Sequence, residues 1–393
     1  MAEAEAPKTV KGKKGKGPPP PGGKGPPPPP DAAAAPAGKG PPPPGGERPG
    51  KGPPAPGAGN WMSPAEVKMR ATIEWLLALD AKEREQMEQA ETFQFTLENP
   101  APPLKATGER PGPAAAEDEA MTLSSMKSFE AAADDGYAGA AAAAAKAETS
   151  EALPVAPGSP PAAIQCTLDM GTVNAAELLC RQGFRPAVMN FAHGYNCGGG
   201  FEHAGGSQEE DIFRKTSVFL SLWPHRRVDD GPGVLARGMW IGDFDEQLDR
   251  KEAFYPHTEC GGIYSPHVRL VCELDIRDTP LTRKDVSSLP TIGVLTVAAQ
   301  DCGREPPFRP ELLYEKLRTA LWLAVQGKHD AVVLGAFGCG YFRNPPDVVA
   351  ETCRGLLQGE FAGAFRAVVF AIPGRFSGNY RSFAELFEER DPR

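Results

Sequence analysis

The sequence predicts an α/β protein with a mostly parallel sheet, preceded by a helical extension and a disordered Pro/Gly-rich N-terminal tail. From about residue 161 onward, short apolar runs rich in β-branched residues alternate with helical runs, which favours a parallel sheet covered on both faces. Glycine (44) and proline (43) make up about 22% of the 393 residues, against an average of roughly 12%. Nineteen prolines lie in the first 57 residues, whereas all eight cysteines lie after residue 165. We therefore expect only the second part of the chain to pack as a domain.

Residues 1–60 are predicted to be the disordered tail. They contain runs of four and five prolines and few apolar side chains, so there is little to bury and few backbone donors to pair. The whole chain has a net charge of −9, but the first 57 residues hold nine Lys/Arg and four Asp/Glu. Two interpretations stay open: a solvated spacer, or a ligand for proline-reading modules that also tethers weakly to anionic polymers.

Residues 61–97 are predicted to form the helical extension. Ser63, Pro64 and Glu66 have the order of an N-cap, a first-turn proline and a capping-box acid. We expect one or two helices over 63–93 that pack on the main domain. Residues 98–160 turn to Ala, Pro and Glu, and are predicted to be a linker.

The last segment, 161–393, contains the predicted sheet. Strand-like runs are expected at 163–168, 187–192, 269–274, 291–299, 331–337 and 366–372. Helical runs are expected at about 172–182, 207–222, 310–327, 345–358 and 379–389. The stretch 224–266 is rich in Asp, Arg, Gly and single aromatics, and is predicted to be a long surface insertion.

Composition also limits location and partners. No apolar run approaches the roughly 20 residues of a membrane span, and the N-terminus has no apolar signal region. Irregularly spaced cysteines favour reduced thiols and an intracellular protein of the cytoplasm or nucleus; KGKKGKG is a weak nuclear signal. The acidic net charge argues against direct DNA binding. We expect no metal, because no CxxC pair or repeated ligand spacing is present. We also expect a monomer without a cofactor.

The first candidate loop follows the strand that ends at Ala192. It contains three consecutive glycines, Gly198, Gly199 and Gly200, and leads to a helix that begins near Ser207. Three glycines suggest a place where only backbone fits against a ligand, and the amides of a helix start can receive an anion. Neighbouring residues on a helix lie about 100° apart, so at most one of Glu209 and Glu210 should face a reacting atom. The alternative is that both are first-turn acids that complement the helix dipole.

The second candidate loop, 335–347, also joins a strand to a helix. Gly335, Gly338 and Gly340 precede Asn344, a candidate helix cap, and Pro345 in the first turn. Such a turn is a common diphosphate cradle, and the alternative is tight backbone packing. Because GxGxxG and the P-loop Gly-Lys-Ser/Thr are absent, a common nicotinamide or ATP enzyme is disfavoured.

Together the two loops resemble a known family. The first loop contains GGG at 198–200, followed after seven residues by QEE at 208–210. This spacing is similar to the signature of the poly(ADP-ribose) glycohydrolases. The preceding NFA, the later LGAFGCGYFRNPP, IYSPHV at 263–268 and the ending VVFAI…NYRSFAELF resemble the microbial-type branch. The resemblance covers roughly 161–390. It implies a macrodomain-like three-layer α/β/α sandwich with a mixed, mostly parallel sheet, and a domain that spans 161–393.

The resemblance also implies residue roles. Glu210 would be the catalytic acid at the ribose–ribose glycosidic bond, Glu209 would hold the ribose hydroxyls, and Gln208 would help to shape the site. The residues that would line or orient the ribose are Gly198, Gly199, Gly200, Asn190 and Asn196. The diphosphate loop would consist of Gly338, Cys339, Gly340 and Phe342, and the candidate polar partner of adenine is Asp169. Two positions depart from the family pattern: Cys197 stands where proline is usual, and His193 replaces a small residue.

The predicted function is hydrolysis of poly(ADP-ribose), with the polymer or ADP-ribosylated proteins as partners. Glycosidic cleavage needs a proton for the leaving oxygen, and a glutamate beside a second glutamate should keep its proton more readily than an isolated one. Two alternatives are a non-catalytic reader of ADP-ribose and an enzyme that removes single ADP-ribose units from proteins. The intact QEE argues against the reader.

Overall fold

The computed structural model describes seven parts of the chain, all within the compact unit Asn60–Arg393. These are residues 64–104, 164–201, 206–227, 248, 250–271, 286–305 and 307–387. The predicted tail 1–60, residues 105–160 of the predicted linker 98–160, and the cap at Ser63 lie outside the described residues. The domain boundaries proposed above therefore stay predictions.

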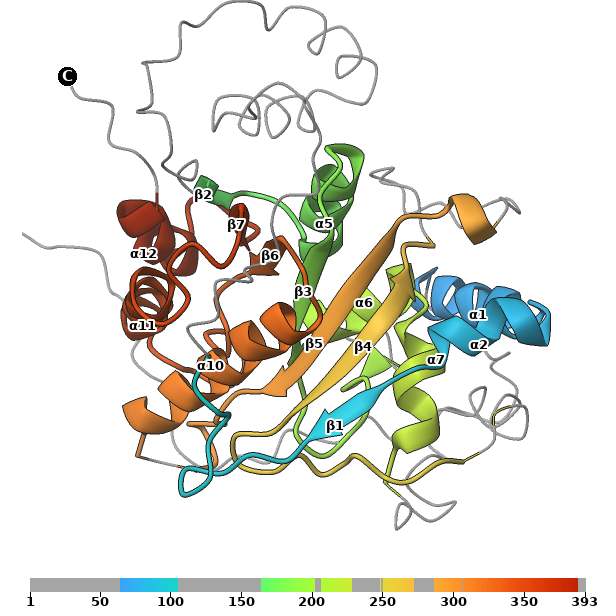
Figure 1. Cartoon of the computed structure of the whole chain (residues 1–393), viewed down its shortest axis with the longest axis horizontal. Coiled ribbons are helices and arrows are strands. Elements are labelled where there is room, and N and C mark those ends of the chain that lie inside the picture. The colour runs from blue at the N-terminus through green and yellow to red at the C-terminus, as the bar shows by residue number, and fades with distance from the viewer. Residues whose placement is uncertain are drawn as a thin grey trace, which may run out of the picture. The chain divides into compact units, whose positions relative to one another are not determined.

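A mixed, mostly parallel sheet of seven strands organises the described part of the chain (Figure 1). The strands are β1 (Glu91–Phe93), β2 (Ile164–Leu168), β3 (Pro186–Ala192), β4 (Gly262–Arg269), β5 (Thr291–Ala298), β6 (Ala331–Leu334) and β7 (Ala367–Ala371). Their order is β1-β4-β5-β3-β6-β7-β2. The β5, β3, β6, β7 and β2 strands pair in parallel, whereas β4 pairs antiparallel with both β5 and β1. The predicted sheet is confirmed.

Helices cover both faces of this sheet (Figure 1). One core contains side chains of α1 (Pro64–Leu77), α2 (Ala81–Met87), α5 (Thr172–Arg181), α6 (Gln208–Lys215) and α7 (Val218–Leu222), and the other those of α10 (Pro310–Gln326), α11 (Pro346–Gln358) and α12 (Gly378–Phe387). Two short 3₁₀ turns are η2 (Trp223–His225) and η3 (Val286–Ser288).

The central strand β3 shows why three layers form. Val188 lies in the first core and its neighbours Ala187 and Met189 in the second, because successive side chains of a strand point to opposite faces. All three are fully buried. A strand buried on both faces reads as a continuous apolar run, which is the pattern that predicted it. No helix in the described part of the chain has the length and apolar character needed to cross a bilayer.

The extension between 63 and 93 is only partly helical. Met69, Ile73 and Leu76 of α1 are fully buried in the first core, so this helix packs on the domain as expected. However, Glu91–Phe93 form a strand that pairs with β4. The extension therefore supplies the edge of the sheet, and the prediction of helix to residue 93 was wrong at its end. Pairing with a distant strand overrides local propensity here.

Two other predicted elements differ from the structure. The strand expected at 269–274 is instead β4, which ends at Arg269 and includes Pro266. Proline usually weakens a strand prediction, but here it lies at a register shift between Ser265 and Val268, where such a residue is tolerated. The helix expected over 207–222 is interrupted at Thr216, which bridges to Leu270.

The stretch 224–266 is also not a surface insertion where the structure describes it. Tyr255 is 3% exposed and Cys260 fully buried, and Ile263 belongs to β4. Backbone bonds tie the segment to the domain, from His257 N–H to the Gly194 carbonyl (2.9 Å) and from Cys260 N–H to the Phe95 carbonyl (2.9 Å). Residues 228–247 and 249 lie outside the described part. The prediction of a surface insertion is therefore wrong only for the described residues of this stretch.

A buried histidine links β4 to the end of α10. The Nδ1 of His329 donates to the Arg185 carbonyl (3.0 Å), and its Nε2 accepts from the Tyr264 hydroxyl (2.8 Å), which fixes one neutral tautomer. Burial lowers the pKa of His329 to about 4, from an ordinary value of 6.5. The unfolded chain therefore takes up a proton at a higher pH than the native protein does. The stabilisation is complete above about pH 6.5 and is lost as the pH falls toward 4.

We expect the wild-type free energy of unfolding to fall more steeply with acid than that of His329→Gln. The extra loss between pH 7.5 and pH 5 should be about 2 kcal/mol. Denaturant unfolding of both proteins at the two pH values measures it, and every other titrating group is common to both. Equal losses in the two proteins would show that His329 titrates normally in the native state.

Candidate active site

The first candidate loop leaves the centre of the sheet. The loop follows β3, which lies between β5 and β6, and it ends at Ser207, the N-cap of α6. Parallel strands end at the same edge, so the loops after β3, β5 and β6 gather there. Both predicted carboxylates, Glu209 and Glu210, lie in the first turn of α6 and are 2% and 7% exposed.

The carboxylate of Glu209 is held by the backbone of the loop. One oxygen accepts from the His193 N–H (2.8 Å) and the other from the Gly198 N–H (3.2 Å). Burial raises the pKa of Glu209 to about 8, and the charge of Glu210 adds to this effect. The bonds from His193, Asn190 and Gly198 oppose it. Glu209 therefore keeps a proton through most of the neutral range.

Glu210 joins the two ends of the glycine-rich loop. Its Oε1 accepts from the Gly200 N–H (2.8 Å), and its Oε2 accepts from the Ser207 N–H (2.8 Å) and hydroxyl. The Ser207 and Glu210 side chains form a capping box. The interpretation as a first-turn acid is thus correct for one oxygen of Glu210, while the other oxygen faces the glycines.

Gly199 is the residue that both carboxylates approach. Its φ is +60°, and an added Cβ would lie 2.8 Å from Oε1 of Glu210 and 2.9 Å from Oε2 of Glu209. Gly198 has a φ of +77°, and a Cβ there would meet the ring of Phe201 at 2.5 Å. The first two glycines are therefore required to seat the carboxylates and a core ring. The helical angle alone does not predict that two consecutive glutamates reach one glycine.

Three polar residues around the carboxylates have different positions. Gln208 accepts from the Phe191 N–H (2.9 Å) and donates to the Met189 carbonyl (2.6 Å), so it fixes the end of β3. Asn190 is fully buried, and its Nδ2 lies 3.4 Å from the Thr296 hydroxyl. The Asn190 Oδ1 has no hydrogen-bond partner in the described part of the chain. Asn196 is exposed, and its carbonyl accepts from the Gly199 N–H (3.1 Å).

The two departures from the family pattern both hold the loop in place. The Nδ1 of His193 accepts from the N–H groups of Tyr195 (3.2 Å) and Asn196 (3.1 Å). Cys197 is 7% exposed and lies beside the buried Tyr255, whose pKa is raised by burial and then by the nearby thiol. No sequence signal identified Tyr255, because it lies in the stretch that resembled a surface insertion.

The second loop is fixed by the side chain of Asn344. Its Nδ2 donates to the carbonyls of Gln300 (2.7 Å) and Gly338 (3.2 Å). Gly338 has a φ of +71°, and an added Cβ would lie 2.6 Å from Asn344 and from Ala299. The prediction that Asn344 caps the helix was wrong, since α11 begins at Pro346 with Pro345 as its N-cap. Asn344 instead binds the loop to the end of β5.

The other predicted residues of this loop, Gly340, Cys339 and Phe342, differ in how far they are exposed. Nothing lies within 4 Å of a Cβ added to the exposed Gly340, so this glycine leaves open space where a ligand could approach the backbone. Burial raises the pKa of Cys339 to about 12, which agrees with a packed residue rather than a reactive thiol. The ring of Phe342 lies 6.3 Å from that of His193, so the two candidate loops meet.

Asp169 is separated from the other predicted residues. It follows β2 at the far edge of the parallel strands. Its oxygens accept from the N–H groups of Gly374 (2.5 Å) and Arg375 (3.0 Å). Asp169 thus joins the loops after β2 and β7, and its contact with adenine stays a prediction.

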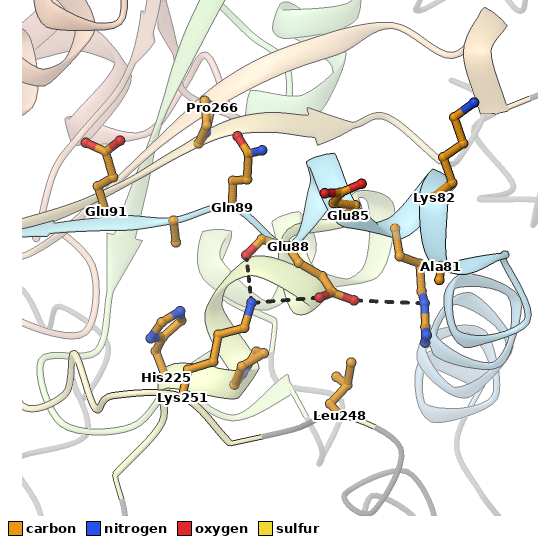
Figure 2. Close-up of a pocket in the computed structure, with 13 residues that line it drawn as sticks. Ala81, Lys82, Glu85, Glu88, Gln89, Glu91, His225, Leu248, Lys251 and Pro266 are labelled. Atoms are coloured by element: carbon orange, nitrogen blue, oxygen red, sulfur yellow. Dashed lines mark hydrogen bonds and ion pairs between the residues drawn. The ribbon is translucent and has the colours of Figure 1, made fainter.

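A surface pocket of about 840 Å³ lies elsewhere, beside α2 (Figure 2). Most of the side chains that line it are polar or charged, and none of the predicted site residues does so. Lys251 reaches the carboxylate of Glu88 (3.7 Å) and its carbonyl (3.4 Å), and Arg84 approaches the same carboxylate (3.9 Å). The pocket is therefore lined by ion pairs that dock the extension, and it is distinct from the candidate active site.

Gly199→Ala should lower the free energy of unfolding by about 2–4 kcal/mol, because it combines a left-handed backbone with two close contacts. Gly206→Ala is the matched control, since nothing lies within 4 Å of a Cβ there. The control should change stability by less than about 0.5 kcal/mol. Thermal unfolding of the three proteins measures both effects. Equal stability of the two variants would refute the close approach at Gly199.

Comparison with known proteins agrees with this geometry. Residues 138–272 match the model of the family described as microbial-type PARG, catalytic domain, and this range contains GGG and QEE. The chain is similar to poly(ADP-ribose) glycohydrolase (PARG) from Thermomonospora curvata, with 21% identity, a TM-score of 0.51, and coverage of 82% of this chain and 98% of that chain.

It is also similar to PARG from Deinococcus radiodurans in complex with ADP-ribose, with 29% identity, a TM-score of 0.43, and coverage of 56% of this chain and 83% of that chain. No curated protein matches the sequence. The first structure supports the fold, and the family model supports the assignment of the domain. The family model thus agrees with the resemblance indicated by the first glycine-rich loop: residues 138–272 match the catalytic domain of microbial-type PARG.

Proposed function

We propose that this protein hydrolyses the ribose–ribose O-glycosidic bonds of poly(ADP-ribose) and releases ADP-ribose, with Glu210 as the general acid and base. One observation carries the assignment of the site. Glu209 and Glu210 both reach the glycine-rich loop, and they approach the same residue, Gly199. A reacting sugar at this loop meets two carboxyl groups and the backbone that holds them.

The reaction requires an acid that gives one proton to the leaving oxygen and a base that takes one proton from water. Glu210 donates a proton to the leaving ribose oxygen as the bond from that oxygen to the anomeric carbon breaks, through an oxocarbenium-like state. Water then adds to the anomeric carbon, and its proton passes to the Glu210 carboxylate, which restores the acid. The Gly200 N–H and Ser207 orient Glu210 for both steps.

Glu209 supports this cycle without competing for the same role. Its pKa of about 8 keeps it protonated at neutral pH, so the pair carries only one negative charge after Glu210 has given its proton to the leaving oxygen. A neutral carboxyl group can both donate to and accept from ribose hydroxyls. We assign Glu209 to substrate binding, with Asn190 and Gln208 supporting the pair from β3 and α6.

The second loop is proposed to hold the diphosphate. Gly338 and Asn344 fix its turn over β5, and Gly340 leaves its backbone open. Backbone N–H groups in such turns bind anions without a cationic side chain. Phe342 packs between this loop and His193, where it can contact the distal ribose.

Glu210→Gln should reduce the hydrolysis of labelled poly(ADP-ribose) at least about 100-fold, because the amide cannot donate and recover the proton. Binding of ADP-ribose, measured by calorimetry, should stay close to that of the wild type. Asp211→Asn is a matched control on the same helix, because Asp211 pairs with Arg214 and Lys215 rather than with the glycine-rich loop. The control should keep full activity.

The same measurements separate the alternatives. A wild-type protein that binds ADP-ribose and releases no product from the polymer is a reader and not a hydrolase. Release of ADP-ribose only from singly modified proteins identifies the third candidate. Full activity of Glu210→Gln would overturn the role of this residue.

We also propose that turnover does not depend on the Pro/Gly-rich tail. Every residue assigned to the site lies after residue 160, so a variant that lacks residues 1–57 should hydrolyse short polymer at nearly the wild-type rate. A large loss of activity would show that the tail contributes to catalysis. We further propose that the tail binds proline-reading modules, that the protein is a monomer, and that it is located inside the cell.

A further inference from the structure

Exposed aromatic side chains stand on both candidate loops. Tyr195, in the loop after β3, is 53% exposed, and Tyr341, in the loop after β6, is 77% exposed. Most large apolar side chains of the domain are buried, and single exposed ones are ordinary. Two exposed rings on loops that meet each other are a different case, because they share one surface.

The two tyrosines are the outer members of a continuous array of rings. Tyr195 lies 6.3 Å from the ring of His193, His193 lies 6.3 Å from Phe342, and Phe342 lies 6.0 Å from Tyr341. The two inner rings are half-buried. The backbone N–H of His193 donates to the carboxylate of Glu209. An inner ring of the array therefore lies beside the proposed catalytic pair, and both outer rings are exposed to solvent.

The backbone fixes the positions of the outer rings. The Tyr195 N–H donates to Nδ1 of His193 (3.2 Å). Around Tyr341, the Arg343 N–H donates to the Gly340 carbonyl (3.2 Å), and the Cys302 N–H donates to the Phe342 carbonyl (3.0 Å). Both tyrosines are thus presented by constrained turns, which lowers the entropy lost when a ligand binds.

We propose that the exposed rings of Tyr195 and Tyr341 form a stacking platform for adenine bases of the polymer, in units next to the one being cleaved. The inference rests on the proposed function. Under the proposed function, the glycine-rich loops hold one ADP-ribose unit, and the next unit is joined to it through the bond beside Glu210. The next unit therefore begins beside the two loops that carry the exposed rings. A purine base stacks on a tyrosine ring without specific polar contacts.

The test uses the double variant Tyr195→Ala/Tyr341→Ala in the full-length chain. We expect kcat/KM for long poly(ADP-ribose) to fall about tenfold, which is within the range for the loss of a stacked base. The affinity for free ADP-ribose should change less than twofold, because that ligand lacks the neighbouring unit. The double variant Tyr195→Phe/Tyr341→Phe should retain the wild-type values, since it keeps both rings.

Tyr314→Ala is the matched control, because Tyr314 is an exposed tyrosine (41%) on α10 and outside both loops. It should leave both measurements unchanged. Polymer affinity measured in the Glu210→Gln background gives a second readout that does not require turnover, and it should also fall about tenfold in the alanine double variant.

Three results would overturn the platform: no loss in the alanine double variant, an equal loss in Tyr314→Ala, or an equal loss of affinity for free ADP-ribose. Absence of hydrolysis by the wild-type protein would instead refute the proposed function, and the affinity measurement would still decide the role of the tyrosines.

Discussion

The rest of the site depends on burial of the Glu209 carboxyl group against the loop after β3. A buried carboxyl group loses its hydration, so its oxygens must find donors in the protein. His193 and Gly198 supply them from the backbone, which fixes the path of the loop. That path forces a left-handed conformation at Gly198 and Gly199 and excludes a Cβ from the space beside both carboxyl groups. Glycine is therefore needed at positions 198 and 199 because of where the Glu209 carboxyl group lies.

This arrangement is supported by segments that are distant in sequence. Tyr255 lies beside Cys197, and the His257 N–H donates to the Gly194 carbonyl. The same segment begins at Lys251, which contacts Glu88 at the end of α2 (Figure 2). The extension also supplies β1 to the sheet. It is therefore a structural part of the domain, connected to the glycine-rich loop through residues 251–257, rather than an appended helix.

The sequence predicted the parts of the structure that depend on local patterns. The parallel strands and their helices follow from apolar runs and spacing, and both loops were located because glycine clusters interrupt such runs. Pairing between distant segments was not predictable. β1 lies in a segment whose sequence favours helix, and β4 contains Pro266, which weakens a strand prediction. For the same reason Tyr255 was missed, because its contact with Cys197 depends on the fold and not on its neighbours. The roles of the individual site residues, with Asp169 the least connected, stay predictions.

The proposed substrate is an acidic polymer and the protein has a net charge of −9, so binding needs a source of attraction other than net charge. We propose that this source is the backbone of the two glycine-rich loops, whose turns are fixed by Glu209 and Glu210 through N–H groups and by Asn344 through the Gly338 carbonyl. Oriented backbone dipoles act at short range and in a fixed direction, whereas surface lysines attract any polyanion and are screened by salt. The aromatic array adds contacts that do not depend on charge. Under the proposed function, such a site would select its substrate by the positions of the ribose, the diphosphate and the base.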